Sequence, residues 1–151
     1  MSFLQITNGK YLIFAALVCM SANAEELNTV YPAVVQEVID GDTVNVKATI
    51  WIKTYKETSV RVRGIDTPEI KSKCDNEKYL AEQAKAFVES ALKNADKVYL
   101  RDVAPDKYGN RILADILYTN DEKTHNLAKE LIKAELAVEY KGKSKNKDWC
   151  E

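Results

Sequence analysis

Five apolar segments, rich in β-branched residues and separated by turn or loop sequences, predict β-strands along this chain. The first two cover residues 31–39 and 43–52 and flank an Asp-Gly-Asp turn, and the third covers residues 58–65. The last two cover residues 97–103 and 111–118, with a polar loop between them. In the third segment valines alternate with arginines, so one face of that strand is apolar and the other is charged.

Two other segments repeat their apolar residues at helical spacing. One runs from about Asn76 to Asn94, and Asp75 or Asn76 is suited to cap its start; its apolar positions are Leu80, Ala84, Phe87, Val88 and Ala91. The other covers roughly Thr124 to Glu135, with an apolar side formed by Leu127, Leu131 and Ile132. Three strands, a helix and two more strands predict a mainly β, α+β fold: a five-stranded OB-fold barrel with two to three helices. Such barrels often bind oligonucleotides, although a fold alone does not determine a function.

The N-terminal 24 residues predict a secretory signal peptide rather than part of the fold. Lys10 precedes the apolar run YLIFAALVCM, and the small residues Ala22 and Ala24 follow it in an A-x-A cleavage site. This run is too short to favour a spanning helix, so an uncleaved membrane anchor is the weaker alternative. We therefore expect export to the periplasm or the medium and one domain over residues 25–151. We expect no membrane association once the signal peptide is removed.

Charge and cysteine content narrow the picture further. The chain has 22 Lys and Arg against 23 Asp and Glu, a formal net charge of -1, so any affinity for phosphates must come from a local cluster. Cys74 and Cys150 remain after the signal peptide, and an even count in an exported chain favours a disulfide. That bridge would close a long loop and contribute up to about 4 kcal/mol in the chain-entropy model. Two free thiols, or a zinc pair without its other ligands, are the alternatives.

Carboxylates gather in two tight turns of the predicted fold. Asp40 and Asp42 flank a glycine, and Asp66 and Glu69 flank the Thr67-Pro68 pair. Oxygen ligands without nearby His or Cys favour calcium or magnesium over zinc. Pro68 moves Thr67 out of helical geometry and can thereby direct the Thr67 carbonyl at a cation. The single histidine, His125, lies at the predicted start of the second helix, where we interpret it as an exposed cap-region residue rather than a ligand.

Arginines complete this candidate site. Arg forks bind phosphate oxygens bidentately and stabilise the charge that develops on them during ester cleavage. Arg61 and Arg111 are the candidates, whereas Arg63, on the same strand face as Arg61, is interpreted as a surface charge. Arg61 and Asp66 are five positions apart, which an ideal strand would place on opposite faces. We expect Gly64 to allow a bulge or twist that brings the two together.

From about Val34 to Tyr140 the sequence resembles the staphylococcal nuclease (thermonuclease) family. VIDGDTV is similar to the family's first metal motif, RVRGIDTPE to the second, and DKYGNRILA to the loop that carries a second arginine. The resemblance implies a Ca2+ cofactor held by the Asp42 and Asp66 carboxylates and the Thr67 carbonyl. It implies that Glu69 directs or deprotonates the attacking water. The substrate phosphate would be bound by Arg61 and Arg111, with further nucleotide contacts from Lys107, Tyr108 and Tyr140.

The sequence departs from the family pattern in three places. Asn110 stands between Gly109 and Arg111 as a one-residue insertion, and Glu135 occupies a position where the family usually has glycine. The chain also ends soon after Tyr140, so we expect the third, C-terminal helix of the family to be absent. We expect a Cys74–Cys150 bridge to take over part of its stabilising role.

The implied function is an exported, monomeric, calcium-dependent endonuclease. It would hydrolyse phosphodiester bonds in DNA and RNA with low sequence specificity and leave 3′-phosphate ends. The alternative is a non-catalytic OB-fold module that binds nucleic acid or a protein partner. All five side chains that the resemblance assigns to metal and catalysis are present, which favours the enzyme, whereas the acidic balance mildly favours the binding module.

Overall fold

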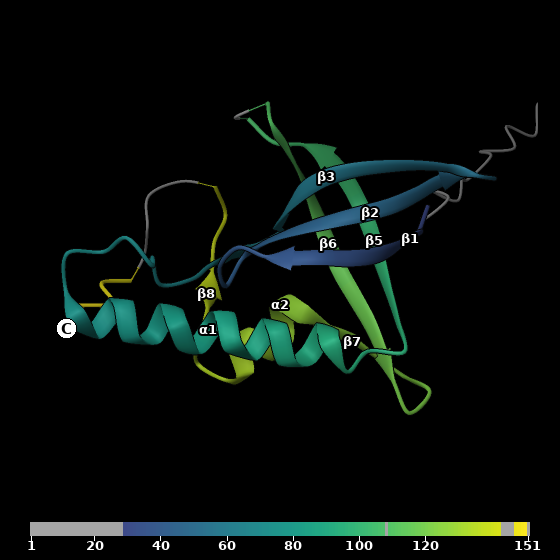
Figure 1. The fold of residues 1–151 in the computed structure, drawn as a ribbon. Helices are drawn as coiled ribbons and strands as arrows, with labels where there is room; N and C mark the ends of the chain where they lie inside the picture. The colour runs from purple at the N-terminus through teal and green to yellow at the C-terminus, as the bar shows by residue number, and fades with distance from the viewer. Residues whose placement is uncertain (1–28, 108, 143–146, 151) are drawn as a thin grey trace, which may run out of the picture.

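The computed structural model describes residues 29–107, 109–142 and 147–150 as a mainly β fold with a closed barrel and two helices (Figure 1). The predicted signal peptide, residues 1–24, lies outside the described residues. The elements, in chain order, are β1 (Tyr31–Val38), β2 (Thr43–Trp51), β3 (Thr54–Val62), β4 (Ile65–Asp66), α1 (Asp75–Lys93), β5 (Lys97–Pro105), β6 (Arg111–Asn120), β7 (Lys123–Asn126), α2 (Leu127–Lys133) and β8 (Val138–Glu139).

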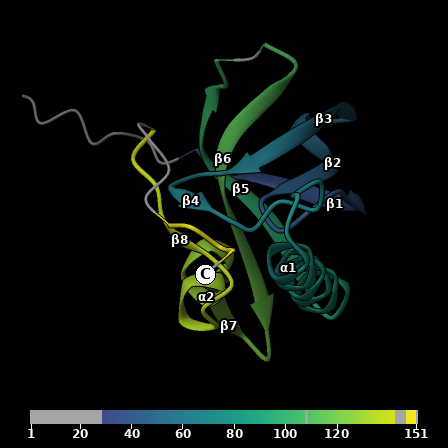
Figure 2. The same cartoon turned by 90° about the vertical axis from the view of Figure 1, so that its left-hand side faces the viewer.

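Strand pairing confirms the predicted five-stranded OB-fold barrel. β2 pairs antiparallel with β1 and β3, β1 pairs with β5, and β5 pairs with β6. β6 then closes the barrel by pairing in parallel with β3, with Ser59 opposite Arg111. Outside the barrel, β7 extends β6, and the short strands β4 and β8 pair with each other. Figure 2, which looks along α1, shows the β4–β8 pair between the barrel and α2.

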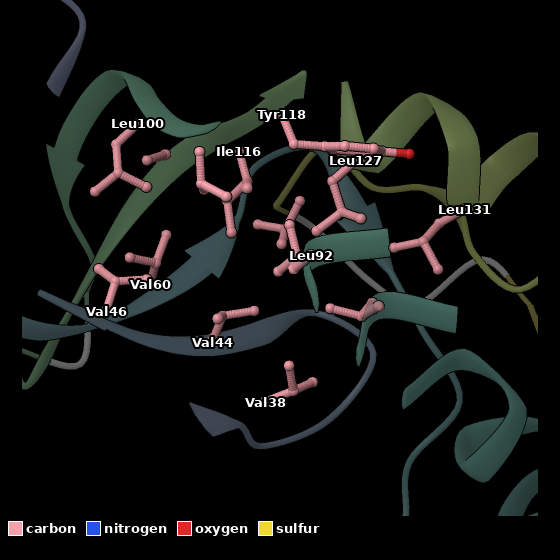
Figure 3. Packing of buried hydrophobic residues seen from close by; sticks show 14 of the residues in the cluster. Val38, Val44, Val46, Val60, Leu92, Leu100, Ile116, Tyr118, Leu127 and Leu131 are labelled. Carbon is pink, nitrogen blue, oxygen red and sulfur yellow. The ribbon is translucent and has the colours of Figure 1, made fainter. Parts of the chain in front are cut away.

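The core fills the barrel and the space between the barrel and the helices (Figure 3). Alternate residues of each strand point inward, so one apolar face per strand is enough to build it. The barrel contributes fully buried residues such as Val44, Val46, Val60, Leu100 and Ile116. The helices close the barrel from outside with Ala81, Ala84, Val88 and Leu92 of α1 and Leu127 and Leu131 of α2. Among the described residues, no helix is both long and apolar enough to cross a membrane.

The second helix begins later than the sequence predicted. Residues 123–126 pair with β6 as the strand β7, so α2 starts at Leu127 instead of Thr124. Asn126 ends that strand and caps the helix, because its side chain accepts a hydrogen bond from the backbone N–H of Lys129 at 3.1 Å. Sheet pairing therefore takes precedence over the helical spacing for residues 124–126.

His125 is consequently not the exposed cap-region residue that we expected. It lies in β7 and is half-buried, and its ring stacks on that of Tyr118 with centroids 5.1 Å apart. Its Nδ1 lies 3.4 Å from Glu130 Oε1. The histidine thus has a packing role between the barrel and α2.

The N-terminal end of α1 differs from the prediction as well. Its cap position is Cys74, with no side-chain cap hydrogen bond, and Asn76 instead donates to the backbone carbonyl of Trp149 at 2.8 Å. The predicted disulfide is present: Cys74 is bonded to Cys150, with Cα atoms 5.8 Å apart. Trp149 is buried beside it. The C-terminal segment is therefore fastened to the start of α1, and the described residues contain no third helix.

Candidate active site

The Asp-Gly-Asp turn between β1 and β2 packs directly against the segment that follows β4. Within the turn, the Asp42 N–H donates to Asp40 Oδ1 at 3.0 Å. A Cβ added at Gly41 would lie 2.8 Å from Ala84 Cβ of α1 and 3.1 Å from Thr67 Cβ. Only glycine permits this close approach without displacing backbone or packed side chains. The two predicted metal motifs are therefore brought together in space.

Three candidate metal ligands lie beneath the surface at this contact. Asp42, Asp66 and Thr67 are all buried, and their carboxylate and carbonyl groups offer only oxygen ligands. Burial raises the pKa of Asp42 to about 6, against the opposing influence of the Arg61 charge and reinforced by Asp40 and Glu69. A buried carboxylate such as that of Asp42 needs a positive charge nearby to remain ionised. The residues present thus fit a hard divalent cation such as Ca2+ or Mg2+.

Arg61 contacts both Asp42 and the residue before Asp66, because the chain turns sharply after β3. Gly64 adopts a left-handed φ of +78°, and β4 begins at the next residue. The half-buried Arg61 side chain then spans the turn, with Nη1 2.6 Å from Asp42 Oδ1 and Nη2 donating to the Ile65 carbonyl at 3.4 Å. The expectation that Gly64 would bring Arg61 and the Asp66 segment together is confirmed.

Arg111, at the first position of β6, shares a sheet face with Arg61. It pairs in register with Ser59, and Ser59 and Arg61 are alternate residues of β3, so all three side chains point to the same side. Arg111 Nε also donates to Asp106 Oδ2. Asp106 is buried, and the hydrogen bond from the Arg111 guanidinium lowers the pKa of Asp106. This pair orients Arg111 toward the site.

Asp106 is a site residue to which the sequence analysis gave no role. The segment that contains it, DKYGNR, was singled out, but only for its Lys, Tyr and Arg side chains. The sequence did offer one signal: Asp106 and Arg111 stand at opposite ends of the same short loop. That spacing predicts a pair only when the loop is known to fold back on itself, as it does here through the hydrogen bond from the Asp106 N–H to the Arg111 carbonyl at 3.3 Å.

A cleft of about 570 Å³ opens above the buried ligands. Of the predicted site residues, the cleft walls include Arg61, Asp66, Glu69, Lys107, Arg111 and Tyr140. Asp42 and Thr67 are not part of its walls and lie buried behind it. Tyr140 is held there because its N–H donates to the Gly64 carbonyl at 2.8 Å and β8 pairs with β4. Tyr108, a predicted nucleotide contact, lies outside the described residues.

Arg63 lines the same cleft but has a different partner. Its Nη2 donates to the backbone carbonyl of Asp102, which has a left-handed φ of +53° in an irregular part of β5. Arg63 is half-buried at the surface and makes this contact from the turn that follows β3. It links that turn to β5 at the point where the β5 ladder is interrupted.

Glu69 is exposed at the cleft and is tied to α1 through its main chain. Its N–H donates to Glu77 Oε1 at 3.1 Å.

Glu77 also lies close to Cys74 and Cys150, and these three form a close group of potential ligand atoms in the described part of the chain. Because the two cysteines are joined in a disulfide, they offer no thiolates to a metal. The alternative of a zinc pair is thereby excluded for this structure.

Comparison with protein families supports the similarity seen in the sequence. A family model described as staphylococcal nuclease homologue matches residues 59–150. This span includes the end of β3 from Ser59, the turn after it, both helices and the disulfide, whereas the Asp42 turn precedes it. A comparison with curated proteins finds no match.

Proposed function

Because the chain belongs to the staphylococcal nuclease homologue family, we propose that it is a calcium-dependent endonuclease that hydrolyses phosphodiester bonds in DNA and RNA. One observation carries the proposal. Arg61 and Arg111 project from neighbouring strands to the same side of the sheet, above the buried Asp42 and Asp66. Two guanidinium groups over an acidic, all-oxygen pair are suited to hold a phosphate against a divalent cation.

In this mechanism the Asp42 and Asp66 carboxylates and the Thr67 carbonyl would hold Ca2+. The ion would supply Lewis-acid polarisation of a phosphoryl oxygen and a fixed position for the attacking water. Arg61 uses two of its N–H donors on Asp42 and the Ile65 carbonyl, and a guanidinium has five, so others remain for the non-bridging phosphate oxygens.

Glu69 and Arg111 complete the reaction. Glu69 accepts a proton from the water as the water oxygen bonds to phosphorus. Arg111, oriented by Asp106, neutralises the charge that builds up on the phosphate in the transition state. The bond from phosphorus to the 5′ oxygen breaks and that oxygen takes up a proton from solvent water, which leaves a 3′-phosphate on one fragment and a 5′-hydroxyl on the other.

Low sequence specificity follows from the same residues. Lys107 joins the two arginines in the cleft, and these cations recognise phosphate, which is identical at every nucleotide. Tyr140 offers a ring on which any base can stack. We infer that both DNA and RNA enter this cleft.

Export belongs to the same proposal. Residues 1–24 act as a signal peptide, and residues 25–151 form the mature, monomeric domain in the periplasm or the medium. The Cys74–Cys150 disulfide supports this, since such bridges persist in oxidising compartments.

A non-catalytic binding module is the second candidate, and one observation favours it. Two of the three cleft arginines are already paired with carboxylates, Arg61 with Asp42 and Arg111 with Asp106, as purely structural arginines would be. In that case the cleft would bind a strand without cutting it.

A nuclease assay separates the two candidates. The purified protein is incubated with DNA and with RNA in calcium, and again after a chelator is added. Cleavage in calcium that stops with the chelator supports the enzyme. Binding of a labelled oligonucleotide without cleavage in calcium, magnesium or manganese would contradict the enzyme and support the binding module.

A further inference from the structure

The β2–β3 hairpin ends in an exposed apolar tip that the proposed active site does not use. Ile50 is 48% exposed, Trp51 73%, Ile52 78% and Tyr55 54%, and we call these four residues the hairpin tip. Figure 1 shows the turn between β2 and β3 beyond the barrel, on the side away from the marked C-terminus. Single exposed apolar residues are ordinary, but adjacent exposed Ile, Trp and Ile side chains indicate an interaction surface.

Backbone pairing between β2 and β3 holds the tip in this exposed arrangement, with a shift of register between Thr49 and Trp51. β2 continues to Trp51 and β3 starts at Thr54, and these two residues are partners in the ladder. Lys53 occupies the turn with a left-handed φ of +57°. The apolar side chains are thus presented by a paired hairpin rather than by an irregular loop. Projecting hairpins usually carry charges at such positions to prevent pairing with other chains. An apolar tip raises the risk of aggregation, and a binding function would explain why it is kept.

The tip has a local excess of positive charge, although Glu57 lies opposite Lys47 in the β2–β3 ladder. Lys47, Lys53 and Lys56 are exposed around it, and residues 47–56 contain no acidic residue. The Lys47 ammonium lies 4.9 Å from the centre of the Tyr55 ring, which keeps this charge beside the apolar side chains. This local basic character contrasts with the net charge of -1 of the whole chain.

The exposed apolar side chains and lysines of the tip fit a lipid bilayer better than a second copy of the chain or nucleic acid. A second copy of the chain would need about 800 Å² of contact on each side, which four side chains on a narrow projecting turn do not provide. Nucleic acid would use stacking rings and arginines, whereas Ile50 and Ile52 have no ring and residues 47–56 contain no arginine. Tryptophan and tyrosine prefer the interface of a lipid bilayer, aliphatic side chains enter its acyl region, and lysines bind anionic headgroups.

We propose that the hairpin tip inserts into the interface of a membrane that contains anionic lipids and so attaches the protein peripherally. Our expectation of no membrane association considered only a spanning segment, and interfacial insertion requires none. β2 runs from Thr43, beside Asp42, to Trp51 in the tip. At roughly 3.3 Å per residue, the site lies about 27 Å from the tip along this strand. A protein attached in this way would keep its cleft open to the solution.

Tryptophan fluorescence tests the proposal directly. The chain has two tryptophans, and Trp51 is exposed while Trp149 is 3% exposed, so a change on adding vesicles reports on Trp51. We expect a blue shift with vesicles of phosphatidylcholine and phosphatidylglycerol, and a much smaller one with phosphatidylcholine alone. Trp51→Phe should remove the shift. The absence of any shift on anionic vesicles would overturn the proposal.

Vesicle sedimentation with matched variants gives the second measurement. Ile52→Ser should weaken binding to anionic vesicles about tenfold, because insertion energy scales with buried apolar area. Tyr79→Ser, which removes a side chain that is 60% exposed on α1, should leave binding to anionic vesicles unchanged. Lys53→Glu with Lys56→Glu should weaken binding more than the same charge reversal at Lys97 and Lys123. All variants carry the same N-terminus. Equal binding by every variant would therefore assign attachment to another part of the chain and refute the proposal that the hairpin tip binds the membrane.

A single-stranded oligonucleotide serves as the competing partner. Quenching of Trp51 by the oligonucleotide, with no response to vesicles, would assign the tip to nucleic acid and overturn the membrane proposal. Circular dichroism and thermal unfolding of each variant confirm that its fold is intact. None of the substituted residues belongs to the cleft, so nuclease activity in solution should be unaffected.

Discussion

At the scale of single residues, two of the three cleft arginines, Arg61 and Arg111, are each held by a buried carboxylate. Arg61 donates to Asp42 and Arg111 donates to Asp106. A guanidinium that is already oriented loses less conformational freedom when it binds a phosphate than one that moves freely in solvent. The two pairs therefore prepare the cleft for a phosphate before any substrate arrives.

Replacing the proposed general base should affect turnover more than binding. We expect Glu69→Gln to lower the rate of cleavage at least about a hundredfold while calcium and nucleotide affinity stay near the wild-type values. The physical reason is that the amide occupies the same volume but cannot accept the proton. Single-turnover cleavage and equilibrium nucleotide binding measure the two effects. Glu82→Gln on α1 is the matched control, and wild-type turnover in the Glu69 variant would make that residue structural.

Arginine-to-lysine substitutions should separate the three arginines of the cleft. Arg61→Lys and Arg111→Lys keep the charge but lose the planar fork, so each should lower the rate by about 10²- to 10³-fold, as for the loss of one transition-state donor. Arg63→Lys should change the rate only slightly, because the Arg63 guanidinium donates to the Asp102 carbonyl rather than to a carboxylate of the site. Rates at saturating calcium decide this. A normal Arg61→Lys with a crippled Arg63→Lys would reverse the assignment.

The Asp106–Arg111 pair should make stability depend on pH in the acid range. The pKa of Asp106 in the folded protein lies below its ordinary value of 3.8, so the pair stabilises the fold above that value. This contribution is lost as the pH falls through the lowered pKa. We therefore expect Asp106→Asn to cost about 1–3 kcal/mol of unfolding free energy at pH 7. Urea unfolding at pH 7 and near pH 2 should show this difference shrinking, and a constant difference would contradict the linkage.

At the scale of elements, two glycines shape the site for different reasons. Gly64 has a left-handed φ of +78° with open space around it, whereas Gly41 has no such φ but is in close contact with α1. Asparagine tolerates left-handed backbone, so Gly64→Asn should cost little. Gly41→Ala should cost about 1–3 kcal/mol through overpacking against Ala84 and Thr67. Thermal unfolding and calcium binding of both variants test this. Equal stability of the two variants would show that the turn at Gly41 can move.

Strand alternation and turn chemistry made most elements predictable from the sequence. The valine–arginine pattern placed β3, and Gly64 between Arg61 and Asp66 indicated the change of direction. The contacts of Arg63 and Asp106 were not predictable, because they depend on an interrupted ladder in β5 and on parallel closure of β6 onto β3. The resemblance supplied the roles of single residues, and those roles stay predictions until the variants are measured.

At the scale of the whole molecule, the disulfide should be a major source of stability. It joins residues 76 positions apart, and the chain-entropy model gives about 4 kcal/mol for a loop of that size. We expect a reductant, or the double change Cys74→Ser and Cys150→Ser, to lower the unfolding free energy by a similar amount. Denaturant unfolding with and without reductant measures it, and the double variant must be insensitive to the reductant. An unchanged midpoint on reduction would show that packing of Trp149 alone fastens the C-terminus.

The same bridge changes what a protease can do to this protein. Cys74 and Cys150 enclose α1, β5, β6, α2 and the loop that carries Lys107, an exposed residue of the kind that trypsin-like enzymes recognise. A single cut in that loop would leave both fragments covalently joined and still paired through the barrel. Arg61 would remain on one fragment and Arg111 on the other, with β3 and β6 in register between them. In a compartment rich in proteases, a nicked molecule can therefore persist as an assembled one.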